Sequence, residues 1–359
     1  MGWGTSFFRY RPQLTGWDIS NSSVKMVELS RNLLGQWVLE GCASEHLAPG
    51  CVMDGDILQP EVVADAMRKL ISHTGIQTKF AAFALPQHVV MRKKIQLPRH
   101  WDGQALEWQI QADISQYLPF PAEEMCWDFG VLDHQPDHPQ SDEREVLLVA
   151  TRKARVEALH HVAALAGLEP MVLDVESYAV CRAARRWMAQ CQKTSPDECI
   201  ALIHIGGQRC HLQIVRHTEV IHDSELGVGG YQLTQSIAQH YGLSLEEAEQ
   251  QKINQTLPSD YALAVCRPFI AQLAEQVRRA LHFFLADMPS RELGPVAIIG
   301  GGACEPGLRE AIAHDMQLPV VVLSPFAGMK FSRQLHPPTI EKQAPMYFTA
   351  CGLAMRRLG

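Results

Sequence analysis

The sequence has no uninterrupted apolar run of about 18 residues, the length that favours a membrane-spanning helix, and its first residues lack the apolar core of a signal peptide. We therefore expect a cytoplasmic protein without a membrane span. None of its ten cysteines forms a Cys-x-x-Cys pair, so neither a zinc ribbon nor thioredoxin-like chemistry is predicted. Positive charge is also scarce: 32 Lys and Arg residues against 39 Asp and Glu residues give a formal net charge of -7, which argues against a nucleic-acid partner.

What is present is ordinary for a folded protein. The chain has 359 residues, of which 47% are hydrophobic and 20% charged. At about 150 residues per domain, this length predicts two domains or slightly more. Most of the sixteen histidines are scattered through polar sequence, and we interpret them as solvated or core residues rather than metal ligands.

One strand pattern occurs twice. Residues 14–41 alternate between apolar and polar side chains around the tip Ser20–Ser23, which predicts a meander of three strands. Residues 201–223 repeat this pattern around a Gly-Gly-Gln-Arg turn, and aligning Asp18 with His204 superimposes the two hairpins. The polar stretch 192–198 between the halves predicts a boundary. We therefore expect a duplicated α/β architecture.

Helical periodicity connects these strands. It predicts helices over 61–73, 106–118, 156–166, 177–190, 231–241, 245–252, 269–287 and 306–314, and strands over 79–85, 126–132, 146–150, 170–174 and 296–299. In the helix 269–287 the apolar spacing places six side chains on the inward face: Phe269, Ile270, Leu273, Val277, Leu281 and Phe284.

The first hairpin tip has the composition of an anion-binding turn. It consists of Ser20, Asn21, Ser22 and Ser23, whose small polar side chains leave backbone N–H groups accessible. Asp18 just before it suits a hydrated Mg²⁺, and Lys25 just after it suits a phosphate charge. Because Ser and Asn are also what any tight turn prefers, the alternative is a turn with no ligand.

Three glycine-rich sites follow in order along the chain. Gly206 and Gly207 form the second hairpin tip, Gly229 and Gly230 precede a helix, and Gly300, Gly301 and Gly302 end a strand. Glycine lets backbone N–H groups approach a phosphate or a sugar closely. Between them, Glu249 and Lys252 share a helix face and suit a ribose or adenine, although a solvated ion pair is the alternative. This order favours a nucleotide held between two halves.

A series of segments with this order resembles the PilM family, the cytoplasmic actin-like proteins of type IV pilus assembly. The segments are GWDISNSSVKMVELS, FALPQHVVMRKKIQLP, ISQYLPFPAEEMCWDFGVL, VLLVATRKARVEAL, AGLEPMVLDVESYAVCRA, ELGVGGYQLTQSIA, EEAEQQK, VAIIGGGA and YFTACGLAMR. They cover nearly the whole chain. The cytoplasmic part of the secretion protein GspL is similar in design but continues into a membrane span, and FtsA, with its terminal membrane helix, is more distant.

The resemblance implies a two-lobed actin-like fold, that is, a duplicated ribonuclease H-like α/β fold, with ATP and Mg²⁺ in the cleft. Residues 1–190 would form the first lobe, with an inserted subdomain at about 87–167. Residues 191–359 would form the second lobe, whose C-terminal helix 346–358 would pack back on the first. Carried over by position, Ser20 to Ser23 with Lys25 would be the first phosphate turn, Gly206 and Gly207 the second, and Gly300 to Gly302 the adenosine turn; Glu249 and Lys252 would meet the nucleoside.

The resemblance also implies a partner. PilM-like proteins bind the N-terminal cytoplasmic peptide of the inner-membrane protein PilN, and through it PilO, which places them at the periphery of the inner membrane. The peptide would enter a groove beside the inserted subdomain, where Tyr117, Leu118, Pro119 and Phe120 are apolar at a helix end. The alternative for these four residues is the core of the subdomain itself.

One departure from actin-like ATPases concerns catalysis. These enzymes place an Asp before the second phosphate turn, whereas this sequence has His204, and an imidazole is a poor ligand for Mg²⁺. We therefore expect a nucleotide-binding scaffold with slow or no hydrolysis. The alternatives are an active ATPase or phosphotransferase, in which His204 or Glu225 would serve as base, and a membrane-tethering protein resembling FtsA.

Overall fold

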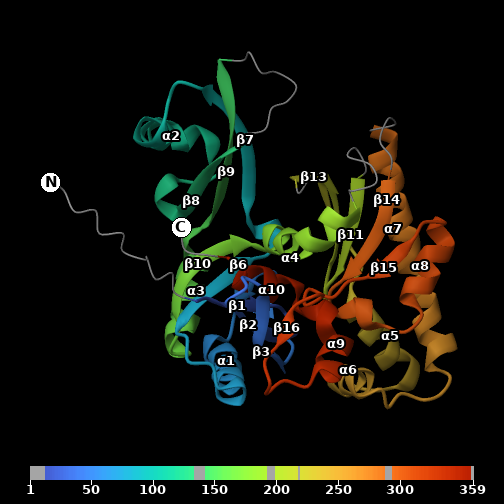
Figure 1. Cartoon of the computed structure of the whole chain (residues 1–359). Coiled ribbons are helices and arrows are strands. Elements are labelled where there is room, and N and C mark those ends of the chain that lie inside the picture. The colour runs from blue at the N-terminus through green and yellow to red at the C-terminus, as the bar shows by residue number, and fades with distance from the viewer. Residues whose placement is uncertain (1–12, 133–141, 192–198, 217–218, 288–292, 357–359) are drawn as a thin grey trace.

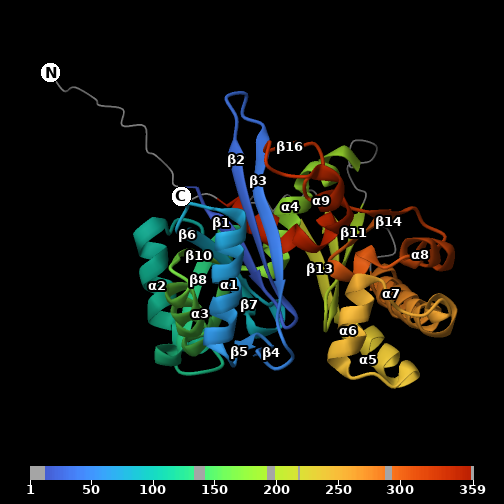
Figure 2. The ribbon, with the colours of Figure 1, turned by 90° about the horizontal axis from the view of Figure 1, so that it is seen from below.

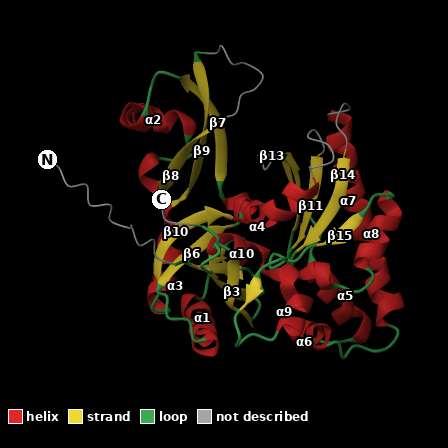
Figure 3. Cartoon of the chain, viewed as in Figure 1, coloured by secondary structure: helices red, strands yellow, loops and turns green. Residues whose placement is uncertain are grey.

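The computed structural model describes residues 13–132, 142–191, 199–216, 219–287 and 293–356. Figures 1 and 3 show two large sheets side by side with helices between and around them, and a smaller sheet that stands apart from both. The boundary predicted at 192–198 and most of the polar loop after Leu132 lie outside the described residues. No helix in the described ranges combines the length and apolar character needed to cross a membrane.

The first large sheet has six strands, and the predicted meander forms its middle. β1, β2 and β3 pair antiparallel. On the other side of β1, β6 pairs parallel with β1, and β10 pairs parallel with β6. The last strand, β16, comes from the far end of the chain and pairs parallel with β3. The order is β10 (Glu169–Val175), β6 (Phe80–Leu85), β1 (Thr15–Ile19), β2 (Ser23–Arg31), β3 (Trp37–His46) and β16 (Lys330–Phe331).

Helices cover both faces of this sheet, and together they form the first lobe. α1 and α3 share one apolar cluster with the sheet, and α4 and α10 pack on the opposite face. α10 approaches closely enough that a Cβ on Gly16 would lie 2.0 Å from the carbonyl oxygen of Ala350. The helices are α1 (Pro60–Thr74), α3 (Lys153–Leu165), α4 (Glu176–Cys191) and α10 (Phe348–Ala354), with α9 (Pro337–Gln343) and the 3-10 helix η5 (Ala344–Tyr347) before α10.

The second large sheet repeats the topology of the first with five strands. β11, β12 and β13 form the antiparallel meander, and β14 and β15 add parallel strands beside β11. The duplication predicted from the two hairpins is thus present in the sheet order. The strands are β13 (Glu219–Leu226), β12 (Cys210–Arg216), β11 (Cys199–Ile205), β14 (Leu293–Ile299) and β15 (Val320–Val322).

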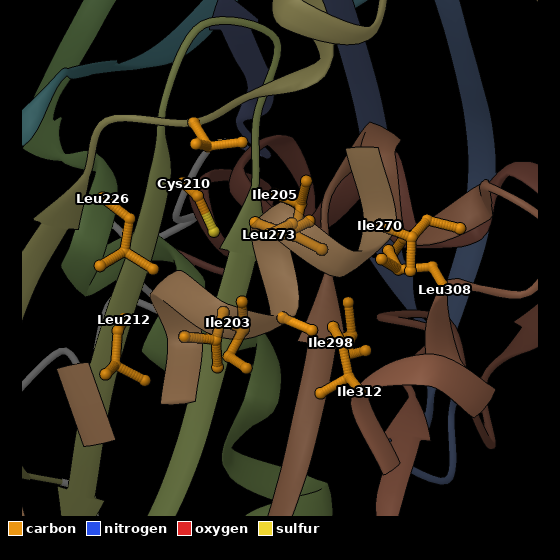
Figure 4. Packing of buried hydrophobic residues seen from close by; sticks show 14 of the residues in the cluster. Ile203, Ile205, Cys210, Leu212, Leu226, Ile270, Leu273, Ile298, Leu308 and Ile312 are labelled. Atoms are coloured by element: carbon orange, nitrogen blue, oxygen red, sulfur yellow. The ribbon is translucent and has the colours of Figure 1, made fainter. Parts of the chain in front are cut away.

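Four helices complete the second lobe around an apolar core, part of which Figure 4 shows. All six side chains predicted on the inward face of the helix 269–287 are buried in this core. The helix predicted at 306–314 is α8, which begins two residues later, at Leu308, because Gly307 is its N-cap residue with φ +81°. The elements are α5 (Gly230–Tyr241), α6 (Leu245–Asn254), the π-helix η3 (Ala262–Cys266), α7 (Arg267–Asp287), η4 (Gly301–Cys304) and α8 (Leu308–Met316).

The third sheet and α2 form a subdomain with its own apolar core. The strand β7 was not predicted from the sequence. Arg92, Lys93 and Lys94 interrupt its alternation of apolar and polar side chains, although Ile95 and Leu97 are buried. The helix α3, within the expected range 87–167, packs instead on the first large sheet. The elements are β7 (Met91–Pro98), β9 (Glu143–Arg152), β8 (Met125–Leu132), α2 (Gly103–Tyr117) and the 3-10 helix η2 (Ala122–Glu124), and the short elements η1 (Gln87–Val89), β4 (Val52–Met53) and β5 (Asp56–Ile57) lie beside them.

Candidate functional site

The tips of the two predicted phosphate turns lie against each other where the two lobes meet. Ser20 and Ser23 close the first tip internally, since the Ser20 hydroxyl donates to the Ser23 carbonyl over 2.9 Å. Ser22 points to the second tip, where a Cβ added to Gly207 would lie 3.1 Å from its Oγ. Two hairpins far apart in the sequence thus meet at their tips, and Ser22 is the side chain nearest to the second turn.

Asp18 and Lys25 occupy paired positions across the first hairpin. The Lys25 Nζ lies 3.2 Å from Oδ2 of Asp18, and both side chains are largely buried. An acid and a base held together at the end of a strand supply an oxygen ligand for a metal ion and a cation for a phosphate. The residues present therefore fit the Mg²⁺ and phosphate roles expected for them.

Glu176 and His204 form a second pair beside the first. The Nδ1 of His204 lies 3.3 Å from Oε1 of Glu176. Burial, with the negative charge of Asp18 as a further cause, raises the pKa of Glu176 to about 7. Burial lowers the pKa of His204 to about 4, so its ring is neutral at physiological pH. The sequence analysis did not identify Glu176, although it directly follows a strand end, where sites in α/β sheets form.

A small cavity with several polar residues in its lining adjoins this pair. Its volume is about 10 Å³, close to the minimum for one water molecule. Among the described residues, three buried polar atoms in its lining have no hydrogen-bond partner: Ser177 Oγ, His211 Nδ1 and Gln213 Nε2. Because such atoms are costly to bury unpaired, the space suits a hydrogen-bonding group rather than an apolar one.

The helix α5 packs directly on the second hairpin tip. The N–H of Gly230 donates to the Gly206 carbonyl over 3.0 Å, and that of Tyr231 donates to the Gly207 carbonyl over 2.6 Å. A Cβ on Gly229 would lie 2.4 Å from the backbone of Gln208. Gly229 therefore allows close packing here, and the backbone amides of Gly230 and Tyr231 are already paired within the protein.

The third glycine cluster lies against the end of β11. Gly300 has φ +90°, and a Cβ there would lie 2.5 Å from His204 Cδ2. A Cβ on Gly302 would lie 2.2 Å from Cγ2 of Ile205, whereas one on Gly301 would meet no described atom within 4 Å. The cluster thus closes over His204, with Gly301 as its open position.

Glu249 and Lys252 contact each other on α6. Their charged groups are 2.6 Å apart, and the Lys252 Nζ also donates to the Thr234 hydroxyl over 2.7 Å. Thr234 in turn donates to Glu249 over 2.5 Å. The pair is largely buried rather than solvated, and a ligand would approach the closed triad rather than two separate side chains.

Ion pairs connect the lobes next to the second tip. Arg92 of β7 lies 3.1 Å from Asp223 of β13. Arg209, at the second tip, lies 2.7 Å from Asp54 in the β4–β5 turn and also pairs with Glu225. Local sequence patterns contain no signal for these pairs, because the partners from opposite lobes are more than a hundred residues apart.

A groove of about 360 Å³ lies beside the inserted subdomain. Pro119 and Phe120, two of the four residues proposed for a peptide groove, line it, and the Arg152 guanidinium lies 4.3 Å from the centre of the Phe120 ring. Leu118 does not line it, because it is buried in the subdomain core, and Tyr117 packs against that core. The full lining is Asp54, His88, Val89, Val90, Met91, Pro119, Phe120, Met125, Ala150, Thr151, Arg152 and Arg155.

The family model described as type IV pilus assembly protein PilM matches residues 16–358. This chain belongs to the PilM family. A solved structure titled "PilM-PilN type IV pilus biogenesis complex" is 24% identical, covers 96% of this chain and 98% of its own, and superimposes with a TM-score of 0.81.

Two further solved structures show how widely the fold of this PilM-family chain occurs. The ethanolamine utilization protein EutJ from Carboxydothermus hydrogenoformans is 18% identical, with 96% of this chain and 89% of that one covered and a TM-score of 0.56. MreB5 of Spiroplasma citri bound to AMPPNP is 12% identical, with coverages of 95% and 94% and a TM-score of 0.50. The expected two-lobed actin-like fold is therefore confirmed.

Proposed function

We propose that this PilM-family protein is an ATP-binding scaffold of type IV pilus assembly that docks the N-terminal peptide of PilN. The observation that carries the nucleotide part is the meeting of the two hairpin tips above Asp18, Lys25, Glu176 and His204. The similarity to MreB5 with bound AMPPNP supports a nucleotide between the lobes.

The site residues take distinct roles in this proposal. Bound Mg²⁺ would supply charge neutralisation for the phosphates, and Asp18 would hold it, directly or through water. Lys25 and the backbone of the turns at 20–23 and 206–207 would bind the phosphates. The glycines at 300–302 would receive the adenosine, with Gly301 open to it, and the triad of Glu249, Lys252 and Thr234 would border the nucleoside.

Hydrolysis would be slow or absent because of His204. Its neutral ring stands where a carboxylate would hold the metal and the attacking water, and its Nδ1 already faces Glu176. The protein would then respond to nucleotide binding rather than to turnover.

The groove beside the inserted subdomain is the proposed PilN site. Its volume, its apolar wall at Pro119, Phe120 and Met91, and its arginines suit a short peptide, and the structure titled as a PilM–PilN complex supports this partner. Through PilN the protein would reach PilO and lie at the cytoplasmic face of the inner membrane.

Calorimetry with ATP and Mg²⁺, with and without a synthetic peptide from the N-terminus of PilN, tests this function. We expect ATP binding with negligible turnover and peptide binding that changes with nucleotide. Phe120→Ala should weaken peptide binding and leave ATP binding intact. Lys25→Ala should weaken ATP binding and leave peptide binding, measured without nucleotide, intact. Robust turnover, or no binding of either ligand, would contradict the proposal.

A specific observation favours one second candidate, an active ATPase. Glu176, with its pKa raised to about 7 beside Asp18, has the chemistry of a general base. It is better placed than Glu225, which Arg209 engages outside this cluster. If the protein turns over ATP, Glu176→Gln should abolish turnover while ATP still binds.

A further inference from the structure

The hairpin between β2 and β3 ends in two leucines that no other described residue covers. Leu33 is fully exposed and Leu34 is 82% exposed. The turn itself is well tied: Oδ1 of Asn32 accepts from the N–H groups of Leu34 and Gln36, each over 3.0 Å, and Gly35 has φ +73°. Figure 2 shows the hairpin projecting beyond the neighbouring helices. Turns usually carry polar residues, so two outward leucines here call for an apolar surrounding.

Aromatic and cationic side chains lie directly behind the leucines. The Arg31 guanidinium lies 4.2 Å from the centre of the Trp37 ring, and it donates to the Gly35 carbonyl over 3.3 Å. On the neighbouring strand, Lys330 pairs with Val38 and is exposed. An apolar tip followed by tryptophan and cations is the order that a membrane interface requires, with hydrocarbon first and headgroups behind it.

The described chain begins at the same end of the sheet. Thr15 of β1 pairs with Glu28, and the Gln13 side chain donates to the Leu29 carbonyl over 2.5 Å, a few residues from the tip. The preceding residues 1–12 contain no Asp or Glu. Their aromatic and cationic residues are Trp3, Phe7, Phe8, Arg9, Tyr10 and Arg11. The composition of residues 1–12, which precede β1 in the sequence, suits an anionic bilayer.

We propose that the tip of the β2–β3 hairpin is a contact for an anionic lipid bilayer, with Leu33 and Leu34 in the interface and Arg31 facing the headgroups. The contact goes beyond the proposed function and requires neither nucleotide nor peptide. The β4–β5 turn, which borders the groove, follows the opposite end of β3 (Figure 2), so the contact leaves the groove accessible. Two leucines and a few cations give a weak, reversible association, which suits a protein that also has a protein anchor.

Co-sedimentation of the full chain with large vesicles tests this contact. One set of vesicles contains equal parts of phosphatidylglycerol and phosphatidylcholine, and the other contains phosphatidylcholine alone. The variant is Leu33→Ser with Leu34→Ser. The matched control is Leu263→Ser, because Leu263 is a 70% exposed leucine on the second lobe. Circular dichroism and the melting temperature establish that each variant is folded.

We expect the protein to bind the anionic vesicles, to bind the neutral ones less, and to lose about tenfold or more of this partitioning in the double variant. The Leu263 control should bind as the wild type does. Absence of binding to anionic vesicles overturns the proposal. Undiminished binding of the double variant also overturns it. A separate variant, Phe7→Ser with Phe8→Ser, tests the N-terminal residues, and the proposal is wrong if vesicle binding is lost in that variant alone. If the double variant instead abolishes self-association in light scattering and leaves vesicle binding intact, the tip is a protein contact and the proposal is wrong.

Discussion

At the scale of single residues, Glu176 and His204 are the most informative pair in the molecule. Burial shifts them in opposite directions, raising the pKa of Glu176 from 4.5 to about 7 and lowering that of His204 from 6.5 to about 4. Each therefore favours its neutral form in the folded protein. Burial thus disfavours a further full charge beside the ion pair of Asp18 and Lys25.

These shifts predict a specific pH dependence of stability. Glu176 binds its proton more tightly when folded, so its contribution to the free energy of unfolding falls as the pH rises from 4.5 to about 7. His204 binds its proton less tightly when folded, so its contribution rises between about pH 4 and 6.5. In the wild type the two slopes oppose each other.

Removing one partner should expose the slope of the other. Between pH 4.5 and 6.5, we expect Glu176→Gln to gain stability relative to the wild type as the pH rises, and His204→Gln to lose it, each by up to about 3 kcal/mol. Urea denaturation at a series of pH values measures this. Curves for both variants that run parallel to the wild type would show that neither group titrates as stated.

Lys25 allows a second prediction at this scale. Lys25→Ala removes the cation paired with Asp18 at the first tip, and we expect it to weaken ATP binding by about tenfold or more. The control is Lys69→Ala on α1, whose pair with Glu45 is exposed. Isothermal titration in the presence of Mg²⁺ measures both affinities. Equal affinities for the two folded variants would remove Lys25 from the site.

At the scale of elements, α10 connects the first sheet to α4 by close backbone contact. A Cβ on Gly352 would lie 1.8 Å from the carbonyl oxygen of Ala179, and one on Gly16 would meet Ala350. Arg182 of α4 and Arg356, just after α10, both lie close to the buried carboxylate of Asp174, at 2.9 and 2.7 Å. These two ion pairs hold the C-terminal end of α10 in place. The C-terminal helix is thus an integral layer of the first lobe.

Gly352→Ala tests this layer. The new methyl group would meet backbone atoms, which cannot rotate away, so we expect a loss of about 2–3 kcal/mol in the free energy of unfolding. Gly130→Ala in β8 is the control, because a Cβ there meets no described atom within 4 Å. Urea denaturation compares the two. A Gly352 variant as stable as the control would mean that α10 can shift to accommodate the group.

At the scale of the whole molecule, the second hairpin tip and the groove are joined by Arg209. Its guanidinium contacts Asp54, which lines the groove, and Glu225, whose carboxylate lies 4.0 Å from His88 on another wall. A ligand that moves the tip therefore moves charged groups at the groove. The apolar clusters also suggest a narrower boundary for the inserted subdomain. We propose to limit it to residues 91–152, since α3 packs on the first large sheet.

Arg209→Gln should reduce the effect of ATP on the affinity for the PilN peptide by about two- to fivefold, as expected for a partly exposed pair. Arg278→Gln, which removes a pair within α7 alone, should leave that effect unchanged. Fluorescence anisotropy of a labelled peptide with and without ATP measures it. Unchanged coupling in the Arg209 variant would show that the lobes communicate by another route.

Local sequence patterns were sufficient to predict many of the helices and the repeat of the three-stranded meander. Periodicity located the helix at 269–287 and its inward face, and the two polar hairpin tips indicated the duplicated fold and the candidate turns, because these signals depend on neighbours along the chain. Which side chains contact one another became clear only from the folded arrangement. It brought Glu176 to His204, Arg209 to Asp54 and Leu118 into a core, since these outcomes depend on packing between segments that local sequence patterns do not encode.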